Sequence, residues 1–66
     1  MDEEILNLSI RKFLKMVGVN SQREIEQAVA KALASGAAPD ACQATMTLEI
    51  PALRLKVTFD GDILVR

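Results

Sequence analysis

The chain has 66 residues, half of them hydrophobic, with eight basic and nine acidic side chains and a formal net charge of -1. This length allows one domain with a marginal core, and the near-neutral charge argues against a strong non-specific nucleic-acid binder. One cysteine and no histidine exclude an internal disulfide and a Cys/His zinc site, and no apolar run is long enough to cross a membrane.

The N-terminus and the cysteine content together predict a cytoplasmic protein. The opening residues MDEEILNLS are acidic and lack the basic segment that begins a secretory signal peptide. The single Cys42 has no partner within the chain, which suits a reducing compartment.

Residues 3–17 are predicted to form a first helix. Its apolar side chains recur at helical spacing and share one face: Leu6, Ile10, Phe13, Leu14 and Val17. Acidic residues begin the segment and basic residues follow, an order that suits the helix macrodipole. Gly18 then stands where a left-handed residue commonly ends a helix.

Residues 22–35 are predicted to form a second helix. Ser21 and Glu24 have the S-x-x-E spacing of a capping box, in which each side chain bonds the backbone of the other residue. An apolar stripe follows: Ile25, Ala28, Val29, Ala32 and Leu33. Gly36 is expected to end this helix, and residues 36–43, which include Pro39, to form a linker.

After the linker the hydrophobic period changes to two, which predicts strands 45–50, 53–59 and 62–66. Pairing Ile50 with Leu53 across a Pro51-Ala52 turn keeps the apolar side chains of the first two strands on one face. Since proline fixes φ near about -65°, this turn is expected to be type I or II.

The same register places polar residues opposite each other on the outer face. It sets Glu49 against Arg54 and Thr47 against Lys56. A three-residue loop, Phe59-Asp60-Gly61, then keeps the apolar residues of strand 62–66 on the inner face.

These elements predict an α+β fold in a single domain, residues 1–66. Two antiparallel helices would pack on one face of a three-stranded antiparallel meander, in the order α-α-β-β-β. The edges of strands 45–50 and 62–66 would stay open to pairing with another copy.

The segment VGVNSQREIE, residues 17–26, has the layout of the joint in a helix-turn-helix DNA-binding domain. Leu14 stands where that motif normally has a small residue, and no third helix completes the core. Glu24 and Glu26 would repel phosphates near the start of the second helix. We interpret the segment as a corner between two packed helices.

A basic cluster on the first helix is the one candidate site. It contains Arg11, Lys12 and Lys15, with Leu8 between the lysines on the polar side and Arg23 as a further member across the corner. The cluster is either a solvated face that complements the helix dipole or a docking surface for an acidic partner, RNA or anionic lipid. Leu8 is either a lone exposed leucine or a contact with a second copy or another protein.

No catalytic, metal or cofactor site is predicted, so we expect a protein that is not an enzyme and has no cofactor. Cys42, Ser9 and Ser21 have no histidine to activate them. Asp60 and Asp62 lack the further acidic ligands of a calcium loop. The three glycines are isolated and form no phosphate-binding loop.

The segments SIRKFLKMVGVNSQREIEQAVAKAL and ATMTLEIPALRLKVTFDG resemble a family of small bacterial proteins that carry a domain of unknown function. The shared pattern is SIRKFLK, then VGV, then SQREIE. The resemblance implies a complete protein of about this length, and it brings no activity, cofactor or ligand.

The sequence therefore favours a protein-interaction module or self-associating domain, monomeric or homodimeric, whose partner is an unknown protein or itself. Leu8, Arg11, Lys12 and Lys15 are the predicted partner-binding residues. The alternative is a weak nucleic-acid-binding protein that uses the same basic cluster. No membrane partner is expected.

Overall fold

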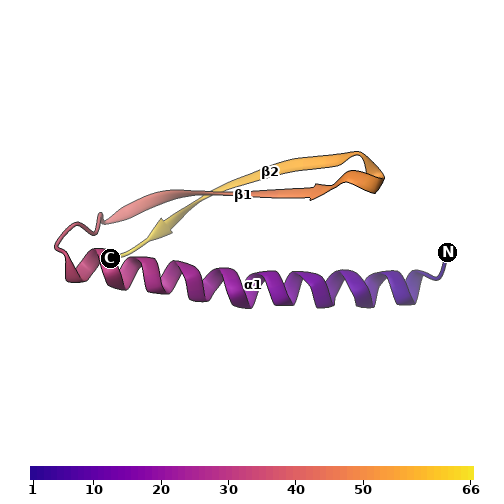
Figure 1. Cartoon of the computed structure of the whole chain (residues 1–66), viewed down its shortest axis with the longest axis horizontal. Helices are drawn as coiled ribbons and strands as arrows, with labels where there is room; N and C mark the ends of the chain where they lie inside the picture. Colours follow the sequence, from indigo (N-terminus) through magenta and orange to yellow (C-terminus); the bar gives the residue numbers. More distant parts are fainter. The chain divides into compact units, whose positions relative to one another are not determined.

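The computed structural model describes residues 1–66 and contains one long helix and one β-hairpin (Figure 1). The elements are α1 (Glu3–Ala34), β1 (Ala41–Ile50), a short 3-10 turn η1 (Pro51–Leu53) and β2 (Leu55–Leu64). The predicted pair of helices on a three-stranded meander is therefore wrong. The chain divides into two compact units, Met1–Gly36 and Ala37–Arg66, and each is described by itself.

Helix α1 begins with a side-chain cap. Asp2 is the N-cap residue in extended conformation, and its carboxylate accepts hydrogen bonds from the backbone N–H groups of Glu4 at 3.0 Å and Ile5 at 3.1 Å. The first four N–H groups of a helix have no partner within it, and Asp2 satisfies two of them.

The helix continues through Gly18, so the predicted helices 3–17 and 22–35 are parts of one element. Gly36 is the only glycine with positive φ, which means that Gly18 does not adopt the predicted left-handed conformation. A glycine inside a helix costs about 1 kcal/mol relative to alanine. Stopping and restarting the helix would instead leave as many as about eight backbone groups without partners. Continuation therefore costs less, and Ser21 lies inside the helix instead of capping it.

The end of α1 follows the sequence prediction for Gly36. The helix ends at Ala34, and Gly36 has a left-handed φ of 75°. The N–H of Ser35 donates to the carbonyl of Lys31 at 3.2 Å, and that of Gly36 to Leu33 at 3.1 Å. These bonds satisfy two carbonyls of the last turn.

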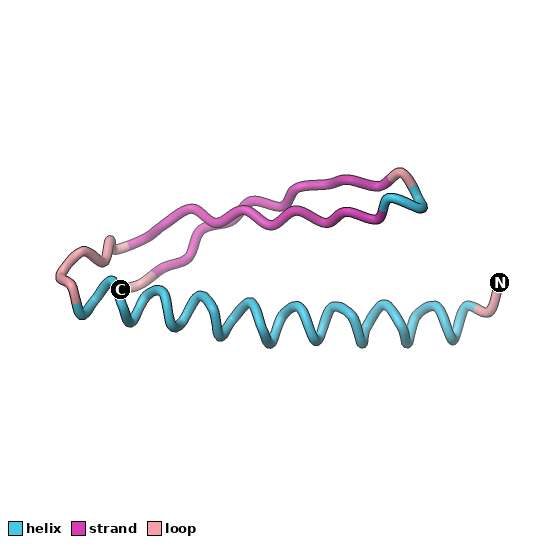
Figure 2. Tube along the Cα trace, viewed as in Figure 1, coloured by secondary structure: helices cyan, strands magenta, loops and turns pink.

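The β-hairpin is a two-stranded antiparallel sheet, drawn in magenta in Figure 2. Its register runs from Ala41 opposite Leu64 to Ile50 opposite Leu55. Strand β1 therefore includes residues 41–43, which were predicted to belong to the linker. The predicted strand 45–50 is the remainder of β1.

The predicted strands 53–59 and 62–66 largely merge into the single strand β2, and no third strand exists. The expected turn at Asp60-Gly61 is absent because Gly61 pairs with Ala44 within the ladder. The hydroxyl of Thr45 also donates to the Asp60 carboxylate opposite it at 3.0 Å. A turn at this point would leave the first four residues of β1 without a strand partner, so the longer ladder is retained.

The turn between the strands has four residues, Pro51–Arg54, where a two-residue turn was predicted. The favoured two-residue hairpin turns have positive φ at their first position, which proline cannot adopt, and a type I or II turn would splay the strands. Here Arg54 takes the left-handed conformation, with φ 53° and ψ 37°, and its N–H donates to the Pro51 carbonyl at 3.0 Å.

This longer turn shifts the predicted register by two residues. Glu49 faces Lys56 in place of Arg54, and Thr47 faces Thr58 in place of Lys56. A shift of two keeps every side chain on its predicted face, because strand side chains alternate with a period of two. The predicted apolar face of these strands is therefore correct.

Neither unit has a buried core. No side chain in the chain is buried, and the least exposed residues of α1 are only half-buried: Val17, Ser21, Val29 and Ala32. In the hairpin the half-buried strand residues alternate on the apolar face: Ala44, Leu48, Ile50, Leu55, Val57 and Ile63. An isolated two-stranded hairpin is only marginally stable in water. No helix of the chain combines the length and the apolar character that crossing a bilayer requires.

Candidate protein-binding surface of the helix

The continuous helix aligns seven residues of the two predicted apolar stripes with the polar Ser21 in one line, and the predicted stripe residues Leu14, Val29 and Leu33 lie beside this line. Eight positions recur at intervals of three or four residues and are called the α1 stripe: Leu6, Ile10, Phe13, Val17, Ser21, Ile25, Ala28 and Ala32. This spacing keeps them near one face of a helix. Ile10 and Phe13 remain 44% and 46% exposed, whereas Val17, Ser21 and Ala32 are half-buried, so the N-terminal half is the more accessible apolar part of the stripe.

The two halves of the α1 stripe differ in side-chain size. The N-terminal half has large residues at Leu6, Ile10 and Phe13. The C-terminal half has one large residue, Ile25, and small residues at Ala28 and Ala32. A straight partner helix can follow such a tapered surface only if its own taper runs the opposite way, because packed interiors leave few voids.

The predicted partner-binding residues all lie on α1 and form what we call the Leu8 patch: Leu8, Arg11, Lys12 and Lys15. Leu8 is 59% exposed, and Lys12 lies one helical turn from it. The only ion pair in the chain joins Asp40 and Arg66, so the basic residues of the patch have no acidic partner. Their binding role stays a prediction.

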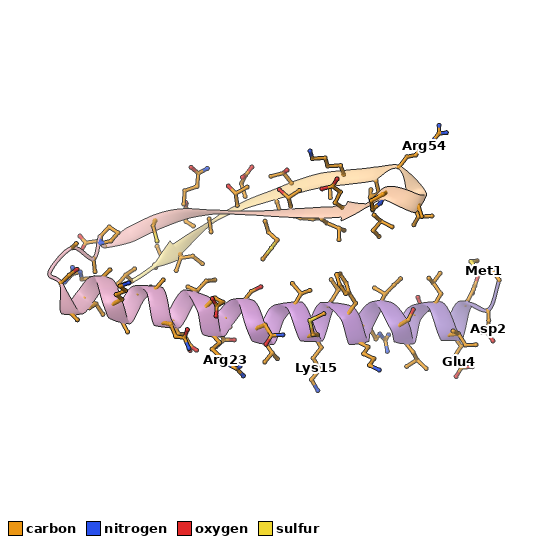
Figure 3. The ribbon with its side chains drawn as sticks, viewed as in Figure 1. Met1, Asp2, Glu4, Lys15, Arg23 and Arg54 are labelled. Carbon is orange, nitrogen blue, oxygen red and sulfur yellow. The ribbon has the colours of Figure 1, made fainter.

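The continuity of α1 changes the position of Arg23. Figure 3 shows Lys15 and Arg23 projecting from the same side of the helix. The segment 17–26 lies within α1, so the predicted corner is wrong, and no helix-turn-helix joint exists there. Arg23 therefore extends the basic side of one straight element.

The hairpin carries a second apolar face. Met46 pairs with Phe59 there, and the two side chains are 45% and 59% exposed. The opposite face is polar and includes the pair of hydroxyls of Thr47 and Thr58, 3.4 Å apart. Sequence reasoning found both faces because the alternation of apolar and polar residues is regular.

Arg66 holds the ends of the hairpin unit together. Its Nε lies 2.7 Å from the Oδ1 atom of Asp40, and its Nη2 donates to the carbonyl of Ala38 at 2.8 Å. The N–H of Val65 donates to the Asp40 carbonyl at 2.8 Å. Sequence reasoning missed this link, since a single arginine at the end of a chain shows no pattern.

The structure shows no group of side chains arranged as a metal site. No group of three or more Cys, Asp or Glu side chains is placed to hold a metal ion. Cys42 is exposed and unpaired in β1. The surfaces offered by the molecule are thus apolar faces and charged helix sides.

The fold and these surfaces define a small α+β protein with one long helix and a β-hairpin. The chain belongs to the family of unknown function DUF6494, which matches residues 1–66. This result confirms the resemblance to a family of unknown function. No curated protein and no solved structure matches the chain.

Proposed function

We propose that this protein acts as a protein-interaction module that binds another protein or a second copy of itself. The observation that supports this function is the exposure of its hydrophobic side chains. None is buried, and fifteen large ones are exposed: Met1, Ile5, Leu6, Leu8, Ile10, Phe13, Leu14, Met16, Val19, Ile25, Leu33, Met46, Leu53, Phe59 and Leu64. Large exposed apolar patches typically mark interaction surfaces.

The free energy available from covering these side chains supports association. Burying one large aliphatic or aromatic side chain stabilises a complex by about 1.5–3 kcal/mol. Covering four of them would contribute roughly 6–12 kcal/mol, which is comparable to the estimated cost of bringing two molecules together. A partner that covers more of them would bind stably.

The Leu8 patch is the proposed contact for an acidic protein surface. Leu8 provides an exposed apolar anchor at 59% exposure, and Arg11, Lys12 and Lys15 provide positive charge without internal ion pairs. Such complementary charges mainly accelerate and orient association, while the apolar anchor slows dissociation.

We place this activity in the cytoplasm of a bacterial cell. The free, exposed Cys42 suits a reducing compartment. The resemblance of the chain to small bacterial proteins supports the bacterial origin. Fractionation of cells that produce the protein would test this location.

Nucleic-acid binding is the second candidate function. The observation that favours it is the placement of Lys15 and Arg23 on the same side of one straight helix (Figure 3). Each phosphate contact releases counterions, so binding to duplex DNA or RNA should weaken steeply as salt rises. Absence of binding at low salt would remove this candidate.

The test of the main proposal is capture of the tagged protein from its native cells, with and without nuclease, combined with sedimentation equilibrium at micromolar concentrations. We expect a stoichiometric protein partner or a mass above the single-chain 7.2 kDa. Leu8→Ser should lose a captured partner. Leu33→Ser is the matched control, because Leu33 is 51% exposed at the other end of α1.

Two results would contradict the proposal if they occurred together. These are a single-chain mass at every concentration and the absence of any nuclease-resistant partner. Equal loss of the partner in the Leu8→Ser and Leu33→Ser variants would show that the contact does not lie in the Leu8 patch.

A further inference from the structure

We propose that α1 pairs with α1 of a second copy in antiparallel orientation, with the two-fold axis level with Val19. This inference rests on the proposed function and deepens it by naming the occupant of the α1 stripe. The spacing, side-chain size, charge order and length of α1 each support a second copy.

The spacing of the α1 stripe is symmetric about residue 19. Reversing the helix about this residue places each stripe position against another stripe position: Leu6 against Ala32, Ile10 against Ala28, Phe13 against Ile25, and Val17 against Ser21. In a helix pair, the side chains of each helix fit between those of the other, which requires the same spacing on both helices. One chain therefore provides both sides of the same interface, as a two-fold symmetric dimer requires.

Side-chain size also selects the antiparallel orientation. In this alignment Leu6 and Ile10 each meet an alanine, so these layers each combine one large and one small side chain, and Phe13 against Ile25 is the one layer of two large side chains. A parallel pair in register would bring Leu6, Ile10 and Phe13 against their own copies. It would also bring alanine against alanine at the other end, which leaves a gap.

The charge order along α1 favours the same orientation. In a parallel pair, Asp2, Glu3 and Glu4 would meet their own copies. The basic residues Arg11, Lys12 and Lys15 would likewise meet basic residues. In the antiparallel pair Lys12 lies level with Glu26, and Arg11 lies one residue from it. These side chains lie away from the stripe, so their attraction acts at a distance and not through contacts in the interface. Lys15 and Arg23 are the one pair of like charges at the same level in this alignment. Both lie away from the stripe.

The length of the stripe also matches a second helix. From Leu6 to Ala32 the stripe extends about 39 Å, at about 1.5 Å per residue. Ten-residue strands such as β1 and β2 span about 33 Å. A copy of α1 therefore fits the whole stripe, whereas a strand pair of this length does not.

Cysteine crosslinking tests the orientation directly. Cys42→Ser removes the native thiol, and Leu6→Cys and Ala32→Cys are then introduced on separate chains. Under mild oxidation we expect a disulfide-linked dimer in an equimolar mixture of the two variants and little in either variant alone. Circular dichroism of each variant confirms that helix content is retained. Efficient crosslinking within either single variant would show a parallel pair and overturn the proposal.

A size exchange tests the same interface without cysteines. Ile10→Ala and Ala28→Ile should each weaken the dimer about tenfold or more, because one leaves a gap and the other crowds the pair. The double variant should recover most of the affinity, since each contact between positions 10 and 28 again joins one isoleucine to one alanine. Sedimentation equilibrium gives the dissociation constants, and failure of the double variant to recover would contradict the pairing.

The failure of this inference can be distinguished from the failure of the proposed function. Absence of crosslinking in the mixture and a single-chain mass overturn the antiparallel pair. A captured protein that depends on Leu8 would still support an interaction module in that case. Leu8 is not part of the α1 stripe, so the two sets of variants report on separate surfaces.

Discussion

The backbone hydrogen bonds of α1 join residues one turn apart, whereas the hairpin pairs range from Ile50 with Leu55 to Ala41 with Leu64. In each unit a helix or strand continues through residues that commonly end such an element. In α1 these residues are Gly18 followed by Ser21 and Glu24, and in β2 they are Asp60 and Gly61. The comparison shows that a regular hydrogen-bonded element can pass through a single unfavourable residue when interruption would leave many backbone groups unpaired.

The largest expected effect comes from breaking α1 at its centre. Gly18→Pro removes a helical hydrogen bond and clashes with the preceding turn, so it should cost about 3 kcal/mol or more and reduce the helix content. Gly18→Ala is the matched control and should stabilise by about 1 kcal/mol, since nothing lies within 4 Å of the added Cβ. Circular dichroism and urea unfolding at fixed protein concentration measure both. A destabilised Gly18→Ala variant would indicate the corner that the sequence predicted.

The same substitution at two other glycines compares the end of α1 with the interior of β2. Gly36→Ala should cost about 1–2 kcal/mol, because Gly36 has φ 75° and a side chain is strained there. Gly61→Ala should instead stabilise by about 0.5–1 kcal/mol, since Gly61 lies in a regular strand with open space around its Cβ. Urea unfolding measures the difference. A loss at Gly61 as large as that at Gly36 would show that β2 turns at this residue.

The N-terminal cap of α1 provides a smaller effect. Asp2→Ala should lower stability by about 1 kcal/mol, because the N–H groups of Glu4 and Ile5 lose their acceptor. Asp2→Asn keeps a side-chain oxygen and should retain most of the helix content by circular dichroism. Equal helix content in the alanine variant and the parent chain would argue that α1 begins elsewhere.

The smallest effect is expected at the ion pair of the hairpin unit. Arg66→Ala should cost less than about 1 kcal/mol, because Arg66 and Asp40 are 59% and 84% exposed and water screens their attraction. The loss should shrink further in high salt. Arg66→Lys keeps the charge and separates it from the hydrogen bond to Ala38. A loss well above this value would mean that Arg66 contributes more to the stability of the hairpin unit than an exposed ion pair does.

The regular spacing of apolar residues predicted more of this structure than the residues that commonly end helices and strands did. The helical spacing from Leu6 to Ala32 and the alternation from Met46 to Phe59 indicated the correct element types and the correct strand faces. These patterns reflect many side chains at once. The predicted number of elements is wrong because α1 continues through Gly18 and Ser21, and β2 continues through Asp60 and Gly61.

The sequence predicts only part of the candidate site. Leu8 was predicted to be exposed, and it is. The symmetry of the α1 stripe could not be recognised while Gly18 divided the helix into two segments, since it depends on residues from both. The link between Arg66 and Asp40 depends on the fold of the hairpin unit and has no local signature.

The central claim is that α1 is one unbroken helix, because the α1 stripe exists only in that case. Nuclear magnetic resonance of the isotope-labelled protein tests it most directly at residues 17–21. We predict helical backbone carbon shifts and continuous sequential amide–amide contacts from Val17 to Ser21. A positive φ at Gly18 together with a capping serine at Ser21 would contradict the claim and remove the basis for the antiparallel pair.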